Sequence, residues 1–165
     1  MSIKKFCFLL GILFLPYFVS ASTDVAYFGA TIPAKYYDEL VRLCTMYSVP
    51  IVYAARLIEW ESRWNPECIT KNPNGSKDLG LMKNNSLFIK ESAFRYNKGI
   101  KYDPLVWKDN MRIGIQHLST MRKHTGSWIG AIIAYNMGLT GFKEWRENKR
   151  IMPEGTKLEI EFVFG

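Results

Sequence analysis

The stretch WESRWNP at residues 60–66 places a carboxylate, Glu61, between two tryptophans. Along a helix that begins near residue 51, Glu61 falls on the same face as Leu57 and Ile58, so its carboxyl group should be partly desolvated. Desolvation disfavours the charged form of a carboxyl group and raises its pKa. A pKa of ~6–7 suits a general acid that works near neutral pH. Glu61 is therefore a candidate catalytic acid, and the alternative is a structural glutamate that pairs with a buried arginine.

A second acid, Asp78, follows the turn-forming sequence NGS at residues 74–76 and precedes Gly80. A loop that folds back at this turn would bring Asp78 opposite Glu61. Most enzymes that hydrolyse glycosidic bonds use two carboxyl groups across a cleft, one as the acid and the other as nucleophile or base. The alternative is that Asp78 only accepts hydrogen bonds from nearby backbone amides in its own turn.

The segment AYNMG at residues 134–138 closes a predicted helix with two polar side chains. Tyr135 and Asn136 can offer a hydroxyl and an amide to one pocket. Taken alone, the segment is explained as well by a packed tyrosine and a helix end, because Gly138 is typical of the position just after a helix.

Other kinds of chemistry find little support in the sequence. His117 and His124 stand about two helical turns apart, and neither has a metal-ligand spacing to Cys44 or Cys68, so we expect no metal site. The chain has no catalytic-triad motif and no phosphate-binding glycine loop, and we expect no cofactor. The net charge of +7 suits an anionic partner, but the basic residues are dispersed, which argues against nucleic acid.

Helices should position most of these groups, because apolar residues recur at three- and four-residue steps along the chain. The 165 residues, 48% of them hydrophobic, are enough for one compact and mainly α domain. Turn-forming residues predict a loop or small hairpin around residues 69–79, whereas the tail from 157 to 164 has no decisive pattern. The predicted helices cover about 33–47, 51–63, 87–96, 111–121, 128–136 and 141–148, with Asn65-Pro66 ending the second and Ser127 capping the fifth.

Residues 1–21 have the features of a secretory signal peptide. Lys4 and Lys5 form a basic head, an apolar run covers residues 6–19, and a small-residue cleavage site ends at Ala21. The run is shorter than the ~20 residues needed to span a bilayer. We therefore expect export to the periplasm or cell envelope, with no stable membrane anchor after cleavage.

Two cysteines, Cys44 and Cys68, remain in the expected mature chain, residues 22–165. In an exported protein an even number of cysteines is compatible with a disulfide. Both residues would serve equally well as small buried hydrophobic side chains, so the sequence leaves the two alternatives open.

Four motifs, taken together and in order, resemble the lytic transglycosylase family of bacterial cell-wall enzymes, which has a lysozyme-like α+β fold. The resemblance extends over roughly residues 33–138 and implies that residues 22–165 form a lysozyme-like transglycosylase domain. The matching segments are IEWESRWNP at 58–66, NPNGSKDLGLMKNNS at 72–86, DPLVWKDNMRIGIQHLSTM at 103–121 and AYNMG at 134–138.

This resemblance implies cleavage of the β-1,4 bond between N-acetylmuramic acid and N-acetylglucosamine in peptidoglycan, with formation of a 1,6-anhydro sugar. Glu61 would act as the single general acid and base. The long loop before Gly80 is similar to that of transglycosylases that accompany envelope-spanning secretion systems, which implies such a complex as a partner beside the glycan strand. The residues expected to bind or orient the substrate are Ser62, Asp78, Met82, Lys83, Tyr135 and Asn136.

Two departures from the family pattern keep other functions open. Lys83 stands where the family has glutamine, and a charge close to Glu61 would weaken it as an acid unless the lysine points into solvent. The segment MPEGT at residues 152–156 resembles a family P-E-T segment, but the tyrosine that usually follows is missing, with Leu158 nearby. The alternatives are a lysozyme-type muramidase that uses Glu61 and Asp78, or a non-catalytic peptidoglycan-binding or secretion-scaffold protein.

Overall fold

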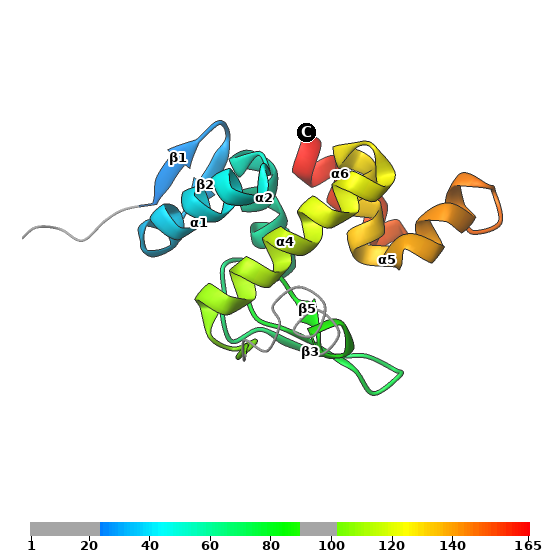
Figure 1. Cartoon of the computed structure of the whole chain (residues 1–165), viewed down its shortest axis with the longest axis horizontal. Helices are drawn as coiled ribbons and strands as arrows, with labels where there is room; N and C mark the ends of the chain where they lie inside the picture. The colour runs from blue at the N-terminus through cyan, green and yellow to red at the C-terminus, as the bar shows by residue number, and fades with distance from the viewer. Residues whose placement is uncertain (1–23, 90–101) are drawn as a thin grey trace, which may run out of the picture.

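The computed structural model describes residues 24–89 and 102–165. The expected signal peptide and all but the first residues of the helix predicted at 87–96 lie outside these ranges, although residues 86–89 are helical. The elements, coloured along the chain in Figure 1, are β1 (Val25–Tyr27), β2 (Ala30–Ile32), α1 (Ala34–Tyr47), α2 (Ile51–Ser62), β3 (Ile69–Lys71), β4 (Lys77–Leu79), β5 (Asn84–Asn85), α4 (Trp107–Thr125), α5 (Trp128–Arg146) and α6 (Glu154–Phe164). The prediction of a mainly α fold with a small hairpin at 69–79 is confirmed.

Helix α4 crosses the middle of the molecule and packs against both α1 and α5 (Figure 1). Helix α6, at the C-terminus, packs against α2 and α5. Elements far apart in the sequence therefore meet around α2, the helix that carries Glu61. The three-stranded sheet has the order β3-β4-β5, with both pairs antiparallel, and β5 also contacts α4.

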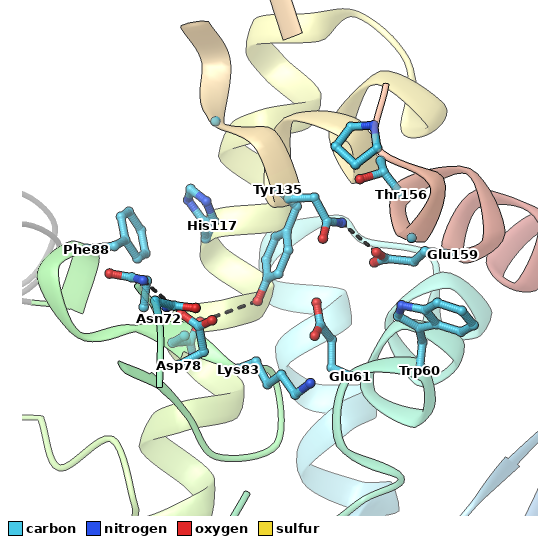
Figure 2. Close-up of a pocket in the computed structure, with 16 residues that line it drawn as sticks. Trp60, Glu61, Asn72, Asp78, Lys83, Phe88, His117, Tyr135, Thr156 and Glu159 are labelled. Atoms are coloured by element: carbon cyan, nitrogen blue, oxygen red, sulfur yellow. Dashed lines mark hydrogen bonds between the residues drawn. The ribbon is translucent and has the colours of Figure 1, made fainter. Parts of the chain in front are cut away.

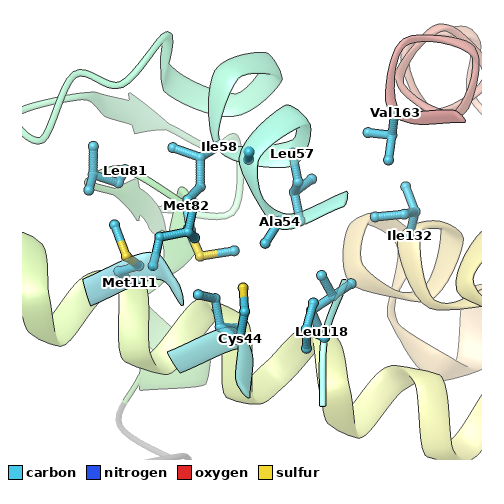
Figure 3. Packing of buried hydrophobic residues seen from close by; sticks show 14 of the residues in the cluster. Cys44, Ala54, Leu57, Ile58, Leu81, Met82, Met111, Leu118, Ile132 and Val163 are labelled. Atoms are coloured by element: carbon cyan, nitrogen blue, oxygen red, sulfur yellow. The ribbon is translucent and has the colours of Figure 1, made fainter. Parts of the chain in front are cut away.

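The hydrophobic core lies where these helices meet (Figure 3). Leu57 of α2, Met111 and Leu118 of α4, and Ile132 of α5 are almost completely shielded from solvent. Full burial of such a side chain contributes roughly 1.5–3 kcal/mol relative to leaving it exposed. The apolar spacing that predicted the helices is thus the spacing that fills the core.

Backbone conformation sets the ends of α1 and α2. Ser48 closes α1 in the left-handed region with φ 54°, and Pro50 caps the start of α2. Helix α2 ends at Ser62 because the next two residues, Arg63 and Trp64, also adopt positive φ values of 52° and 61°. The predicted end at residue 63 was nearly right, but the left-handed turn, rather than the proline at position 66, stops the helix.

The last helices include one confirmed cap and one element that the sequence pattern left open. Gly130 N donates a hydrogen bond of 2.9 Å to Ser127 Oγ, which confirms the cap predicted for α5. Gly138, with φ 72° and ψ 165°, interrupts α5 at the predicted stop, and a second helical segment follows up to residue 146. The tail forms α6. Across residues 24–89 and 102–165, the helices are all too short or too polar to span a lipid bilayer.

Candidate active site

A cavity of about 670 Å³ lies where α2, the three-stranded sheet, α4, α5 and α6 converge. Figure 2 shows the side chains that line it, which come from segments distant in the sequence. Five residues singled out in the sequence line this one cavity: Glu61, Asp78, Lys83, Tyr135 and Asn136.

Glu61 sits at the end of α2 and is partly buried. Burial raises the pKa of its carboxyl group to about 7; the positive charge of Lys83 opposes this rise, and the negative charge of Asp78 adds to it. Desolvation therefore dominates over the lysine, as expected when burial penalises the charged form more than a neighbouring charge stabilises it. A carboxyl group that keeps its proton near neutral pH is suited to general acid catalysis.

The two tryptophans that flank Glu61 have different environments. Trp60 lines the cavity and packs against Phe162 of α6, with ring centroids 5.6 Å apart. Trp64 is buried and stacks on Tyr36 of α1 at a centroid distance of 5.5 Å. The left-handed turn after α2 sends Trp64 into the core, so only Trp60 borders the cavity beside Glu61.

Asp78 belongs to the hairpin formed by β3 and β4, where it pairs with Thr70 on one side and Asn85 of β5 on the other. Asn85 Nδ2 donates hydrogen bonds to Asp78 Oδ1 at 2.8 Å and to Ser76 Oγ at 2.9 Å. A cross-strand amide therefore holds the carboxylate. The hairpin brings Asp78 into the cavity that Glu61 lines, as the turn sequence predicted.

The loop before Lys83 is attached to α4 by one buried side chain, Asn110. Asn110 Oδ1 accepts a hydrogen bond from Met82 N at 2.9 Å, and its Nδ2 donates to Leu79 O at 2.7 Å and to Pro104 O at 2.8 Å. Gly80 makes this approach feasible, because a Cβ there would lie 2.6 Å from Asn110 Cγ.

Lys83 follows this attachment and lines the cavity, with its side chain directed toward Glu61 in Figure 2. Its backbone has a φ of 42°, an unusual value for a residue with a side chain. Of the two orientations considered for Lys83, the structure thus shows the one that faces the acid. Even so, the pKa of Glu61 remains well above its usual range.

Tyr135 and Asn136 reach the cavity from α5. The Tyr135 hydroxyl donates a hydrogen bond of 2.7 Å to Met82 O, and burial raises the pKa of this phenol well above its ordinary value, so the group stays neutral. Asn136 Nδ2 donates to Glu159 Oε2 at 2.6 Å and to Ile132 O at 3.3 Å.

Glu159 of α6 is a second buried carboxyl group in the cavity, and the sequence did not identify it. Its side chain is only 1% exposed. Burial and the nearby charge of Glu61 raise the pKa of Glu159 to about 8, while the hydrogen bond from Asn136 and the charge of Lys83 act in the opposite direction. Leu158, which stands near the position of the missing tyrosine, is 47% exposed and faces outward.

His117 and Phe88 also line the cavity without having been predicted. The His117 ring lies between two aromatic rings, with centroids 4.0 Å from Phe88 and 5.2 Å from Tyr135. Burial lowers the pKa of His117 to about 4, so the imidazole is neutral near neutral pH. Nothing in the local sequence marked either residue, since each stands in an ordinary helical pattern.

Two predicted substrate-binding residues do not line the cavity. Met82 is fully buried in the core, where its side chain packs against Gly114 of α4, so it contributes only its carbonyl to Tyr135. The Ser62 hydroxyl donates a hydrogen bond back to Ile58 O at 3.2 Å in its own helix. Both residues are neighbours in the chain of a residue that lines the cavity, but their side chains point to other sides of the backbone.

Neither Cys44 nor Cys68 lines the cavity. Cys44 and Cys68 are free thiols rather than a disulfide, and burial raises the pKa of Cys44 to about 12. Within the ranges that the structure describes, no cluster of three or more His, Cys, Asp or Glu side chains is arranged to hold a metal ion.

Comparison with solved structures places the fold in the lysozyme-like class of lytic transglycosylases. An inactive mutant of the lytic transglycosylase Slt from Pseudomonas aeruginosa is 20% identical, with a TM-score of 0.65 over 79% of this chain and 23% of that chain. The 70-kDa soluble lytic transglycosylase in complex with bulgecin A is 25% identical, with a TM-score of 0.68 over 79% and 23% of the two chains. The 70-kDa soluble lytic transglycosylase from Escherichia coli is 24% identical, with a TM-score of 0.62 over 78% and 22%.

Residues 42–155 match the family model of the transglycosylase SLT domain. The match covers more than half of the sequence, and the chain belongs to this family. It spans less than a quarter of the length of the solved structures that it matches. A comparison with curated proteins found no match.

Proposed function

We propose that this chain is an exported lytic transglycosylase that cleaves the β-1,4 bond between N-acetylmuramic acid and N-acetylglucosamine in peptidoglycan and leaves 1,6-anhydromuramic ends. The observation that carries the proposal is Glu61, a carboxyl group with its pKa raised to about 7 in the cavity of a transglycosylase domain. Residues 1–21 would be the signal peptide, and residues 22–165 the mature domain in the periplasm or cell envelope.

Glu61 would serve in turn as acid and base. The protonated carboxyl group gives its proton to the glycosidic oxygen as the bond from that oxygen to C1 of the muramic acid breaks. The C6 hydroxyl oxygen then bonds to C1 and closes the anhydro ring, and the Glu61 carboxylate accepts the hydroxyl proton. The enzyme returns to its starting state without water, and a group with a pKa near the working pH suits both steps.

Other cavity residues support this cycle through charge and hydrogen bonding. Lys83 faces Glu61 and would stabilise the carboxylate that exists between the two proton transfers. Tyr135 is neutral, and its hydroxyl donates to Met82 O at 2.7 Å and lies 3.4 Å from Asn84 Oδ1, so its oxygen can still accept a hydrogen bond. Asn136 and Asp78 would contact the sugar.

The test is digestion of purified peptidoglycan sacculi, with the released muropeptides identified by mass. Wild-type protein should release anhydromuramyl products, and Glu61→Gln should release none while keeping its fold. Glu67→Gln, at an exposed position after α2, is the control for loss of one negative charge and should keep full activity. Full activity of Glu61→Gln would refute the catalytic assignment. Binding to sacculi without any released product would instead favour a non-catalytic wall-binding protein.

A lysozyme-type muramidase is the second candidate, because Asp78 lines the cavity with Glu61 and acts on its pKa. A pair of carboxyl groups can hydrolyse a glycosidic bond with water as the acceptor. Products with reducing ends would identify this reaction, and Asp78→Asn should then abolish it. In the transglycosylase reaction proposed here, Asp78→Asn should weaken turnover but leave the anhydro product unchanged.

A secretion-system or other envelope complex is the proposed partner beyond the glycan strand. The support is the sequence resemblance of the loop before Gly80 to that of secretion-associated transglycosylases; the residues of this loop form the β3–β4 hairpin that carries Asp78. Purification of the exported protein together with envelope components after cross-linking would test this, and recovery of the protein with sacculi alone would contradict it.

A further inference from the structure

We propose that Glu159 is a positioning residue for the reaction at Glu61: it fixes the Asn136 side-chain amide so that the amide oxygen faces the substrate. The inference rests on the proposed function, because it assigns a role within that same cavity. Glu159 lies on α6 and Asn136 on α5, two helices that pack against each other, and both residues line the cavity with Glu61.

The two hydrogens of the Asn136 amide are both engaged. Nδ2 donates to Glu159 Oε2 at 2.6 Å and to Ile132 O at 3.3 Å, the first of which is drawn in Figure 2. Among the residues that the structure describes, no side chain or backbone group donates to Asn136 Oδ1. An asparagine amide has one accepting oxygen and one donating nitrogen, so fixing the nitrogen also fixes the direction of the oxygen.

Glu159 can hold the amide in this orientation whether or not it is ionised. A carboxylate is purely an acceptor, and a protonated carboxyl group still accepts through its carbonyl oxygen. The group is fully shielded, and its Oε1 has no hydrogen-bond partner among the described residues. A buried carboxylate with a single donor would be poorly stabilised, which favours the neutral acid.

The charged and titratable groups around Glu159 agree with a neutral acid. Glu61 faces it from α2 and Lys83 from the loop between β4 and β5, while Tyr135 reaches the same cavity from α5. The carboxylate of Glu61 disfavours a second negative charge nearby, and the pKa of Glu159 is about 8. Near neutral pH, Glu159 therefore orients Asn136 without competing with Glu61 for the positive charge of Lys83.

The oriented oxygen determines which substrate groups the cavity accepts at this point. An acceptor in the cavity that Glu61 lines binds a hydroxyl group or an amide N–H, and N-acetylated sugars carry both. If the amide turned over, it would present donors there instead and would leave the substrate's own donor unpaired. An unpaired polar group of this kind weakens binding by more than the hydrogen bond contributes.

The test compares Glu159→Gln with Glu159→Leu in the muropeptide assay at pH 6. Gln keeps an accepting oxygen, so its kcat/KM should stay within about threefold of wild type, whereas Leu removes the acceptor and should lower kcat/KM by about tenfold or more. Glu161→Leu, on the exposed side of the same helix, is the matched control and should behave like wild type.

Stability and substrate binding separate positioning from a structural role. Glu159→Leu should have a melting temperature at pH 8 equal to or above that of wild type, because it removes a buried carboxyl group. In a Glu61→Gln background, where turnover is absent, Glu159→Leu should weaken binding of an N-acetylglucosamine oligosaccharide, and Glu159→Gln should not.

The possible failures are distinct. Full activity of Glu159→Leu, or an equal loss in Glu159→Gln and Glu159→Leu, would overturn the positioning role. Absence of any product from wild-type protein would instead refute the proposed function, and the oligosaccharide measurement would still decide whether Glu159 orients Asn136.

Discussion

The buried carboxyl group of Glu61 should make the protein less stable as the pH rises, and Glu61→Gln should reverse this. The folded protein holds the pKa of this group at about 7, against an ordinary value of 4.5. A group whose pKa is raised on folding contributes its full stability below the unfolded pKa and loses that contribution as the pH rises through the folded pKa. The window of interest therefore runs from pH 4.5 to above pH 7.

The expected magnitude follows from the size of the shift. One pKa unit corresponds to about 1.4 kcal/mol, so wild type should lose roughly 2–3 kcal/mol from this group between pH 4.5 and pH 8. Glutamine has nearly the same shape and no charge. Glu61→Gln should thus match wild type at pH 4.5 and exceed its free energy of unfolding at pH 8 by that amount.

Urea unfolding followed by tryptophan fluorescence at both pH values would measure the difference. Glu67→Gln removes the same charge from an exposed position and controls for the change in net charge. A difference between Glu61→Gln and wild type that is the same at pH 4.5 and pH 8 would show that folding does not desolvate Glu61. The assignment of Glu61 as the acid would then lose its physical basis.

Three further outcomes are expected. Lys83→Gln removes a charge that lowers the pKa of Glu61, so the alkaline limb of the pH profile of kcat/KM should move to higher pH, and an unmoved limb would show that the lysine does not act on the acid. Tyr135→Phe leaves the Met82 carbonyl without its 2.7 Å hydrogen bond and should lower the free energy of unfolding by about 1–3 kcal/mol in urea titrations; no loss would show that another donor replaces the hydroxyl. Gly114→Ala would put a methyl group 2.7 Å from the Met82 Cβ and should cost about 1–3 kcal/mol in the same measurement, whereas an unchanged midpoint would mean that α4 can shift to accept it.

The sequence predicted the helices whose apolar faces enter the core, because the residues that recur with helical periodicity are the ones that become buried. It left the tail that forms α6 undecided, and the reason is physical. The buried residues of that helix are Thr156, Glu159 and Val163. Two of the three are polar, so the sequence lacks the apolar periodicity by which a buried helix face is predicted. Glu159 thus interrupts the apolar pattern of the helix at the same position at which it places a carboxyl group in the cavity.

The site residues that belong to sequence motifs could be predicted, whereas those that reach the cavity only through the packing of the helices could not. Glu61 and Asp78 stand in recognisable segments, and their pairing follows from a turn that reverses the chain. His117 joins the cavity only because α4 and α5 pack side by side. The direction of Trp64 depends on a left-handed turn that no residue type in the stretch required.

The attachment of the hairpin to α4 through Asn110 suggests how the cavity could be altered by changes in the hairpin. The tip of the hairpin closes on itself, since Asn72 N donates to Ser76 O at 2.9 Å and Ser76 N donates to Asn74 Oδ1 at 3.0 Å. The base is held by two hydrogen bonds, from Met82 N to Asn110 Oδ1 and from Asn110 Nδ2 to Leu79 O. One contact links the tip to the site, because Asn85 Nδ2 donates to both Ser76 Oγ and Asp78 Oδ1. A tip of another length can therefore be grafted here without moving Lys83, provided that it keeps an acceptor at the position of Ser76.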